Sequence, residues 1–233
     1  MKGLVKSAIA SLLVLSSIQV SAALHIRDLD GNWSNGHEAV YDDVLDITWL
    51  ADANYAETSG YAAANANGSV DSTDANIQAD GRMGWQAANI WADTLVFGSH
   101  SDWRLTSINT PTQAGFHQSS SELGHMFYNN LGNMAGNPLG NVSFMDSATG
   151  NTESFINMQI SRYWYEDENQ SVDYTAWGFG NSGGYQDYNF TYHSFYAWAV
   201  HDGDIGASPV PLPAAAYLFL SGLVGLRIAK RKK

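Results

Sequence analysis

Three tyrosines near the end of the chain suggest a chemistry of carbohydrate recognition. Tyr185, Tyr188 and Tyr192 are spaced three and four residues apart, and Tyr196 follows after four more. A flat aromatic face is a surface on which a sugar ring packs, and neutral hydrogen-bonding groups orient the hydroxyls. Such groups are interleaved with the tyrosines at Asn181, Gln186 and Asn189. We predict a glycan-binding surface, with core or cross-strand aromatic pairs as the alternative.

Clustered carboxylates suggest a second chemistry, the binding of calcium. Asp42, Asp43 and Asp46 lie close together in the sequence, and calcium takes carboxylate oxygens as ligands. Neither this run nor the pair Asp202 and Asp204 has the D-x-[DN]-x-[DN]-G spacing of an EF-hand loop. Calcium is therefore a candidate cofactor at Asp42, Asp43 and Asp46, but solvated surface acids are the interpretation that we favour.

A third pattern, the sequence GNSGG from Gly180 to Gly184, fits the G-x-S-x-G motif of serine hydrolases. That motif works only on a sharp turn between a strand and a helix. The residues after Gly184 have a strand-like pattern instead, which predicts a hairpin loop. The chain has no cysteine, and its histidines lack the H-E-x-x-H spacing of a zinc site. We predict no catalytic residues and no transition metal.

Charge and composition limit the partners of the domain. Between Leu24 and Leu226 four arginines stand against all 23 acidic residues, which leaves a formal charge of −19. Such a surface repels nucleic acid and anionic polymers. Because no disulfide can form, buried aromatic residues must supply much of the stability. Arg104, which follows Trp103, is expected to pair with a buried acid, since a buried guanidinium needs a partner.

The sequence patterns around these residues predict an α+β domain with two helices and antiparallel strands. Helical spacing indicates one helix within 80–98, with Asp80 as its cap, and a second from about Ser120 to Leu131, where Ser119 and Glu122 fit a capping box. Residues 41–56 read most simply as a strand leading into a turn, and 60–81 as an exposed loop. The remaining strands come late, in 153–204.

The N-terminus has the pattern of a secretory signal peptide. Lys2 and Lys6 precede an apolar run, and small residues at 20–22 suit signal peptidase. We predict that residues 1–22 are removed and that the protein is exported. A buried N-terminal helix is the alternative.

The C-terminus has the pattern of a membrane segment. Residues 212–229 are apolar enough to form an 18-residue helix of about 27 Å, close to the thickness of a bilayer core. A basic tail closes it and favours the cytoplasmic side; the tail consists of Arg227, Lys230, Arg231, Lys232 and Lys233. A plain membrane anchor would explain these features too.

The segment from Val210 to Lys233 closely resembles a PEP-CTERM sorting signal. It has a proline motif, Pro211-Leu212-Pro213, then a short helix with small residues and a basic cluster. The motif departs from the Pro-Glu-Pro of the family at its middle position, Leu212. The resemblance implies recognition by exosortase in a Gram-negative bacterium, transient anchoring in the inner membrane, and delivery to the outer surface or extracellular matrix.

A second resemblance covers most of 24–208. The blocks VYDDVLDITWLADANYA, GWQAANIWADTL, SDWRLTS, SRYWYEDE and YAWAVHDGD stand in the order found in the family related to the Lcl C-terminal domain. Thr106 and His201 depart from its usual proline and arginine. The resemblance implies a single C-type-lectin-like domain, non-enzymatic and associated with exopolysaccharide or envelope glycan. A structural acidic surface protein without a ligand is the alternative.

Mature protein from the native host should lack both residues 1–22 and the helix after Pro213, because both segments are processing signals. Intact-mass spectrometry of surface protein measures this directly. If Lys230 to Lys233 were still present, the sorting hypothesis would fail and a permanent anchor would replace it.

Overall fold

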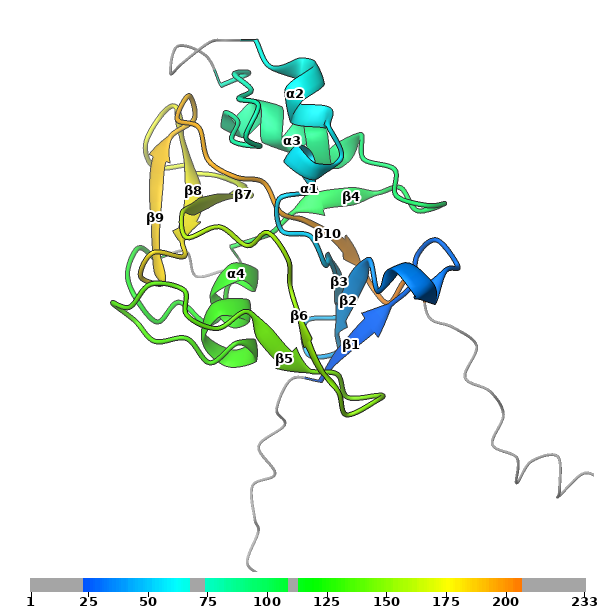
Figure 1. Cartoon of the computed structure of the whole chain (residues 1–233). Helices are drawn as coiled ribbons and strands as arrows, with labels where there is room; N and C mark the ends of the chain where they lie inside the picture. The colour runs from blue at the N-terminus through cyan, green and yellow to red at the C-terminus, as the bar shows by residue number, and fades with distance from the viewer. Residues whose placement is uncertain (1–22, 68–73, 109–112, 207–233) are drawn as a thin grey trace, which may run out of the picture.

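The α+β class with antiparallel strands is confirmed. The computed structural model describes residues 23–67, 74–108 and 113–206. These residues form a five-stranded sheet, a three-stranded sheet, a two-stranded ribbon and four short α-helices (Figure 1). All pairings between the named strands are antiparallel.

The five-stranded sheet joins the two ends of the described chain. Its order is β1-β2-β3-β10-β4, so the last strand lies between β3 and β4. The strands are β1 (Leu24–Arg27), β2 (Ala39–Asp42), β3 (Ile47–Leu50), β4 (Trp103–Leu105) and β10 (Ala199–Asp202). Arg27 also forms a two-pronged ion pair with Asp204, which lies just beyond β10. The start and the end of the fold are thus held side by side.

The single strand expected to open residues 41–56 is instead a hairpin. β2 and β3 pair with each other, and residues 43–46, which include two aspartates, form the turn between them. Asp46 has a φ of 54° there, and Val44, expected in the strand, is 46% exposed. Aspartate tolerates the left-handed conformation that such a turn requires, which is why the chain reverses at this point.

The second sheet contains β7 (Arg162–Glu168), β8 (Thr175–Gly180) and β9 (Tyr185–Phe190). Residues 181–184 connect β8 directly to β9, so the expected hairpin loop at GNSGG is confirmed. The ribbon consists of β5 (Ser143–Met145) and β6 (Thr152–Ser154).

The first expected helix is shorter than predicted. It is α3 (Trp85–Asp93), capped by Gly84 rather than by Asp80. Residues before it are held extended, because Met83 exchanges backbone hydrogen bonds with Phe195. A side-chain carbon at Gly84 would lie 2.4 Å from the carbonyl oxygen of Asp74, so glycine is needed at this close approach.

The second expected helix begins two residues later and changes its winding. It consists of α4 (Glu122–His125) and a π-helical turn, η2 (Met126–Asn130). Ser121, not Ser119, caps it, with its hydroxyl oxygen accepting from the amide of Gly124 at 3.2 Å. The expected apolar face is confirmed, because all its members are buried: Leu123, Met126, Phe127 and Leu131.

Two further helices occupy chain that was expected to be extended or loop. They are α1 (Tyr55–Thr58) and α2 (Tyr61–Asn65), and a 3-10 turn, η1 (Trp33–Asn35), precedes them. Ala62 in α2 is fully buried, as are Asn76 and nearly all of Ile77. The prediction of an exposed loop over 60–81 was therefore wrong for these residues. Small residues let this stretch pack closely without showing an apolar period.

Aromatic side chains form the core, as the composition predicted. The largest fully buried side chains include four tryptophans and two tyrosines: Trp49, Trp103, Trp164, Trp198, Tyr163 and Tyr165. Three of these four indoles donate to backbone carbonyls: that of Trp103 reaches His100 at 3.2 Å, that of Trp164 reaches Met83 at 2.9 Å, and that of Trp198 reaches Leu50 at 2.8 Å. These bonds satisfy the polar edge of each ring and fix its orientation.

The expected pairing of Arg104 is confirmed. Its guanidinium, on β4, makes two bonds of 2.9 Å to Glu122 of α4, and reaches Asp202 of β10 at 2.6 Å. Burial lowers the pKa of this guanidinium, but its hydrogen bonds to Glu122 and Asp202 and the charges of these acids raise the pKa by more. The pKa of Arg104 therefore lies above its usual value. Glu122 also accepts from the amide of Ser107 at 2.6 Å. The arginine thus locks α4 onto the five-stranded sheet.

The terminal predictions lie outside the described residues. This holds for the signal peptide 1–22, for Pro211, Leu212 and Pro213, and for the basic tail. Among the helices that are described, none has the length and hydrophobicity to cross a bilayer.

Replacing Arg104 with methionine should lower the free energy of unfolding by about 3 kcal/mol, because Glu122 would be left buried without a counter-charge. Urea denaturation measures this. The matched control is Arg82→Met, whose partner Asp80 is 44% exposed at its side chain; it should cost less than about 1 kcal/mol. Equal losses in the two variants would contradict the structural role of Arg104.

Candidate functional site

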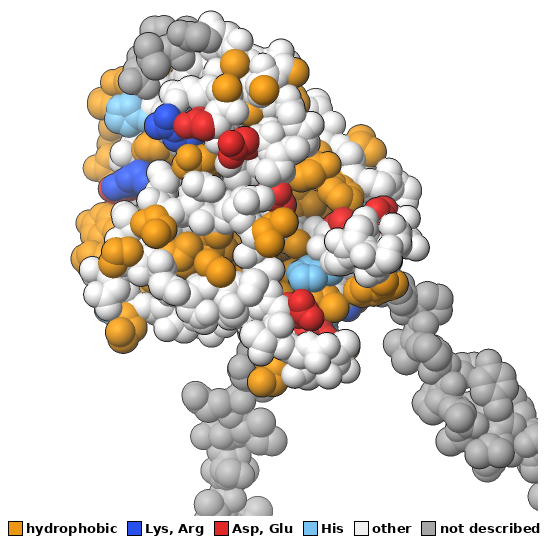
Figure 2. All heavy atoms as spheres, in the orientation of Figure 1, with side chains coloured by type: hydrophobic (Ala, Val, Ile, Leu, Met, Phe, Trp, Pro, Cys, Tyr) orange, Lys and Arg blue, Asp and Glu red, His pale blue; other side chains and the backbone are white. Residues whose placement is uncertain are grey.

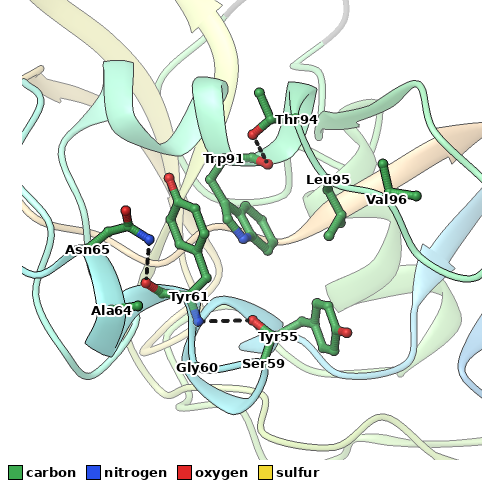
Figure 3. A pocket seen from close by; sticks show the side chains of 10 residues that line it. All are labelled: Tyr55, Ser59, Gly60, Tyr61, Ala64, Asn65, Trp91, Thr94, Leu95 and Val96. Atoms are coloured by element: carbon green, nitrogen blue, oxygen red, sulfur yellow. Dashed lines mark hydrogen bonds between the residues drawn. The ribbon is translucent and has the colours of Figure 1, made fainter.

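An open groove lies between α1–α2 and α3. Its volume is about 430 Å³, within the roughly 300–1,000 Å³ of ligand pockets. Figure 3 shows Tyr61 of α2 extending toward Trp91 of α3, with Tyr55 of α1 nearby. The remaining lining is small, neutral or aliphatic: Ser59, Gly60, Ala64, Asn65, Thr94, Leu95 and Val96.

Local sequence explains how the walls of the groove form. Gly60 has a φ of 80°, which permits the tight turn between α1 and α2. The side-chain amide of Asn65 donates to the carbonyl of Tyr61 at 2.9 Å and closes α2. On the other wall, the buried residues Ala88 and Ala92 seat α3 in the molecule and bring Trp91 to the base of the groove.

The chemistry that this groove offers is stacking and neutral hydrogen bonding. Neither the hydroxyl of Tyr55 nor that of Tyr61 bonds another residue of the described chain, so both are available to a ligand. Burial, with a smaller effect of Asp52, raises the pKa of Tyr55, which keeps its hydroxyl protonated. The lining contains no carboxylate, imidazole or basic group. The groove therefore provides a neutral binding surface in which the two tyrosine hydroxyls are the ionisable groups of the lining.

A second, smaller cavity of about 200 Å³ shares Tyr55 with the groove. Its walls include Glu38, Asp52 and His37, together with apolar side chains at Leu50, Ala51, Phe97 and Ile156. The ring of Tyr55 packs on that of Phe97, with centroids 5.1 Å apart. Two carboxylates thus stand beside a neutral aromatic groove.

Glu38 also belongs to a group of three acids. Oxygens of Asp28, Asp30 and Glu38 lie within 4.8 Å of one another, with Asp28 buried and Asp30 exposed. Burial and the charges of Asp30 and Asp28 raise the pKa of Glu38, although a bond from the amide of Leu29 opposes the shift. Such mutual repulsion is relieved by a cation. The group could hold a metal ion such as calcium.

The residues predicted to bind calcium are not brought together. Asp42 is buried and occupied by the amides of Val44 and Leu45 and by the side chain of Asn130. Asp43 instead accepts from the amide of Ala23, and Asp46 from the hydroxyl of Tyr41. These three aspartates shape the β2–β3 hairpin, each with a different partner.

The predicted glycan-binding tyrosines do not share one surface. Tyr185 and Tyr188 are three residues apart in β9, so their side chains point to opposite faces. Tyr185 packs edge-on against Phe116. Tyr188, 44% exposed, packs against Trp177, while the ring of Tyr192 stacks on Phe190.

Sequence reasoning missed both features that the structure brings together. The run Asp28-Leu29-Asp30-Gly31-Asn32 was a usable signal, because alternating oxygen donors begin an EF-hand loop. Trp33 stands where that loop has glycine, which breaks the strict motif. No comparable signal exists for the groove, since the helical spacing within 80–98 does not show which segment packs over Trp91. The packing of Tyr61 near Trp91 arises only in the tertiary structure.

No family model matches the chain, and neither a curated protein nor a solved structure matches it. The two family resemblances stay predictions.

Calcium should raise the melting temperature of the full-length protein saturably, because an ion bound only to the folded state stabilises it. Glu38→Gln should abolish the saturation and raise the melting temperature of the metal-free protein at neutral pH. The sign follows from the raised pKa of Glu38 in the folded protein. As the pH rises from 4.5, the usual pKa, through the higher pKa of the folded state, ionised Glu38 becomes more costly in the folded state than in the unfolded state, and stability is lost. Glutamine carries no charge and avoids this loss.

Asp43→Asn, which removes the same charge outside the acidic group, is the control for this calcium titration and should keep the saturation. A gradual rise without saturation, shared by all three proteins, would instead indicate general screening of the acidic surface.

Proposed function

We propose that the protein is an exported, non-enzymatic protein that binds a neutral part of an extracellular or envelope glycan in the groove between α2 and α3. The observation that supports this most directly is the lining of the groove. Two partly exposed aromatic rings, at Tyr55 and Tyr61, stand over the buried ring of Trp91 and are combined with neutral hydrogen-bonding groups and no charge. Flat apolar faces beside hydroxyl and amide groups suit a sugar ring, which has both kinds of surface.

The openness of the site to solvent sets the expected strength of binding. A single shallow, wet site holds a sugar with a dissociation constant of about 1 mM. Many copies on one surface would retain a polymer far more tightly through multivalency. Display at high density outside the cell is therefore part of the proposed function.

Processing and location are further parts of the proposal, carried by the terminal segments. Signal peptidase would release the N-terminus, and exosortase would act at the Pro211-Leu212-Pro213 motif after transient membrane anchoring. The product would reach the outer surface or matrix of a Gram-negative bacterium. We also propose that the domain is related to C-type-lectin-like domains; its α+β architecture with antiparallel sheets is compatible with this relationship. For the acidic group of Asp28, Asp30 and Glu38, we propose calcium as the bound ion.

A purely structural acidic surface protein is the second candidate, favoured by the net charge of −12. On the face in Figure 2, however, acidic side chains are scattered among neutral and hydrophobic ones. A continuous acidic coat would need a denser distribution there.

A glycan array with the full-length protein should reveal retention on neutral polysaccharides. Tyr61→Ala should weaken it about tenfold, because one stacking ring contributes roughly 1 kcal/mol or slightly more. The matched control is Tyr174→Ala, which removes a ring that is 77% exposed at another site. If Tyr188→Ala abolished binding while Tyr61→Ala did not, the site would lie on the β-sheet surface. Absence of any glycan binding would favour the structural coat.

A further inference from the structure

We propose that the ligand is a glycan with free amino groups, whose neutral part lies in the aromatic groove while a protonated amine enters the neighbouring acidic cavity. This inference rests on the proposed glycan binding and specifies the class of sugar that the same site takes. Its basis is the position of Tyr55, which lines both cavities.

The two cavities differ in chemistry but form neighbouring subsites. The groove of about 430 Å³ has no charged lining residue, whereas the cavity of about 200 Å³ is lined by Glu38 and Asp52. A ligand that crosses Tyr55 therefore passes from a neutral to a negative environment. An oligosaccharide can span them because successive sugars present their substituents along one chain.

The negative charge of the smaller cavity is held in place. Asp52 accepts from the amide of Asn54 at 2.9 Å, from the hydroxyl of Thr58 at 2.7 Å and from the side chain of Asn157 at 2.9 Å. Glu38 accepts from the amide of Leu29 at 3.0 Å. These bonds fix both carboxylates without neutralising them, so the cavity attracts a positive group.

No basic side chain lines this cavity to compete for the acids. The imidazole of His37 has its own acidic neighbour, because its Nδ1 lies 3.8 Å from a carboxylate oxygen of Glu153, which is not part of the cavity wall. A sugar amine, which donates three hydrogen bonds when protonated, supplies the missing counter-charge.

The apolar part of the cavity wall also favours an organic cation. Leu50, Phe97 and Ile156 give the carbon skeleton of a sugar a surface to contact.

A metal ion in the acidic group would use Glu38 too, so calcium and the amine should bind antagonistically, each weakening the binding of the other by the same factor.

The test compares glucosamine and N-acetylglucosamine tetramers, which differ only in the free amine, by calorimetric titration of the full-length protein. At about pH 6 an aliphatic amine is protonated. In low salt with a chelator present, the glucosamine tetramer should bind about fivefold more tightly. Calcium should reduce the affinity for that tetramer alone.

Two variants separate the acidic cavity from the groove. Glu38→Gln keeps an acceptor for the amide of Leu29 and should abolish the preference without changing affinity for the N-acetylated tetramer. Tyr61→Ala should weaken both tetramers equally. Asp43→Asn removes one charge outside the cavity and should keep the full preference.

The outcomes distinguish this inference from the function on which it rests. Equal binding of the two tetramers would overturn the inference and leave glycan binding standing. A preference lost equally in Glu38→Gln and Asp43→Asn would also overturn it, because general attraction to an acidic surface would then be the cause. If neither tetramer nor any neutral glycan binds, the proposed function fails as well.

Discussion

Trp198 lies at a point in the core where separate segments of the chain meet. Its indole contacts the rings of Trp49, Phe155 and Tyr163, which come from separate segments of the chain. Its N–H donates to the carbonyl of Leu50. Because the chain has no cysteine, this dry aromatic contact performs the long-range linking that disulfides provide in many exported domains. The five-stranded sheet can form only once the last strand has entered it.

The site depends on that closure. When β10 enters between β3 and β4, it places β4 beside α3, which packs against both β4 and β7. Arg104 then secures α4 to the same sheet through Glu122. With α3 held by this framework, α1 and α2 fold over it from the end of β3 and enclose the groove. The binding surface is thus built from short helices whose positions are decided by strands far away in the sequence.

Electrostatics divide the surface into parts with different partners. The four arginines of the domain are all engaged with acids, namely Asp204, Asp80, Glu122 with Asp202, and Asp187. No unpaired basic group in the described chain is available to attract an anionic polymer. The groove is neutral, and the acidic cavity beside it is negative. This distribution is compatible with the proposed binding of neutral and amino sugars, whereas uronic or sulfated polymers would meet repulsion.

The sequence by itself determined the class of fold, the aromatic core, the paired state of Arg104 and the hairpin at residues 181–184. Each of these follows from local periodicity or from the cost of burying an unpaired charge. It could not determine the limits of α3, because Gly84 and Met83 are constrained by contacts with Asp74 and Phe195. Nor could it show which candidate residues lie together. Tyr185 and Tyr188 are close in the sequence, but a strand sends their side chains to opposite faces. Glu38, Tyr55 and Trp91 are distant in the sequence, and tertiary packing, which depends on side-chain volumes meeting across the whole chain, places them in two neighbouring cavities that share Tyr55.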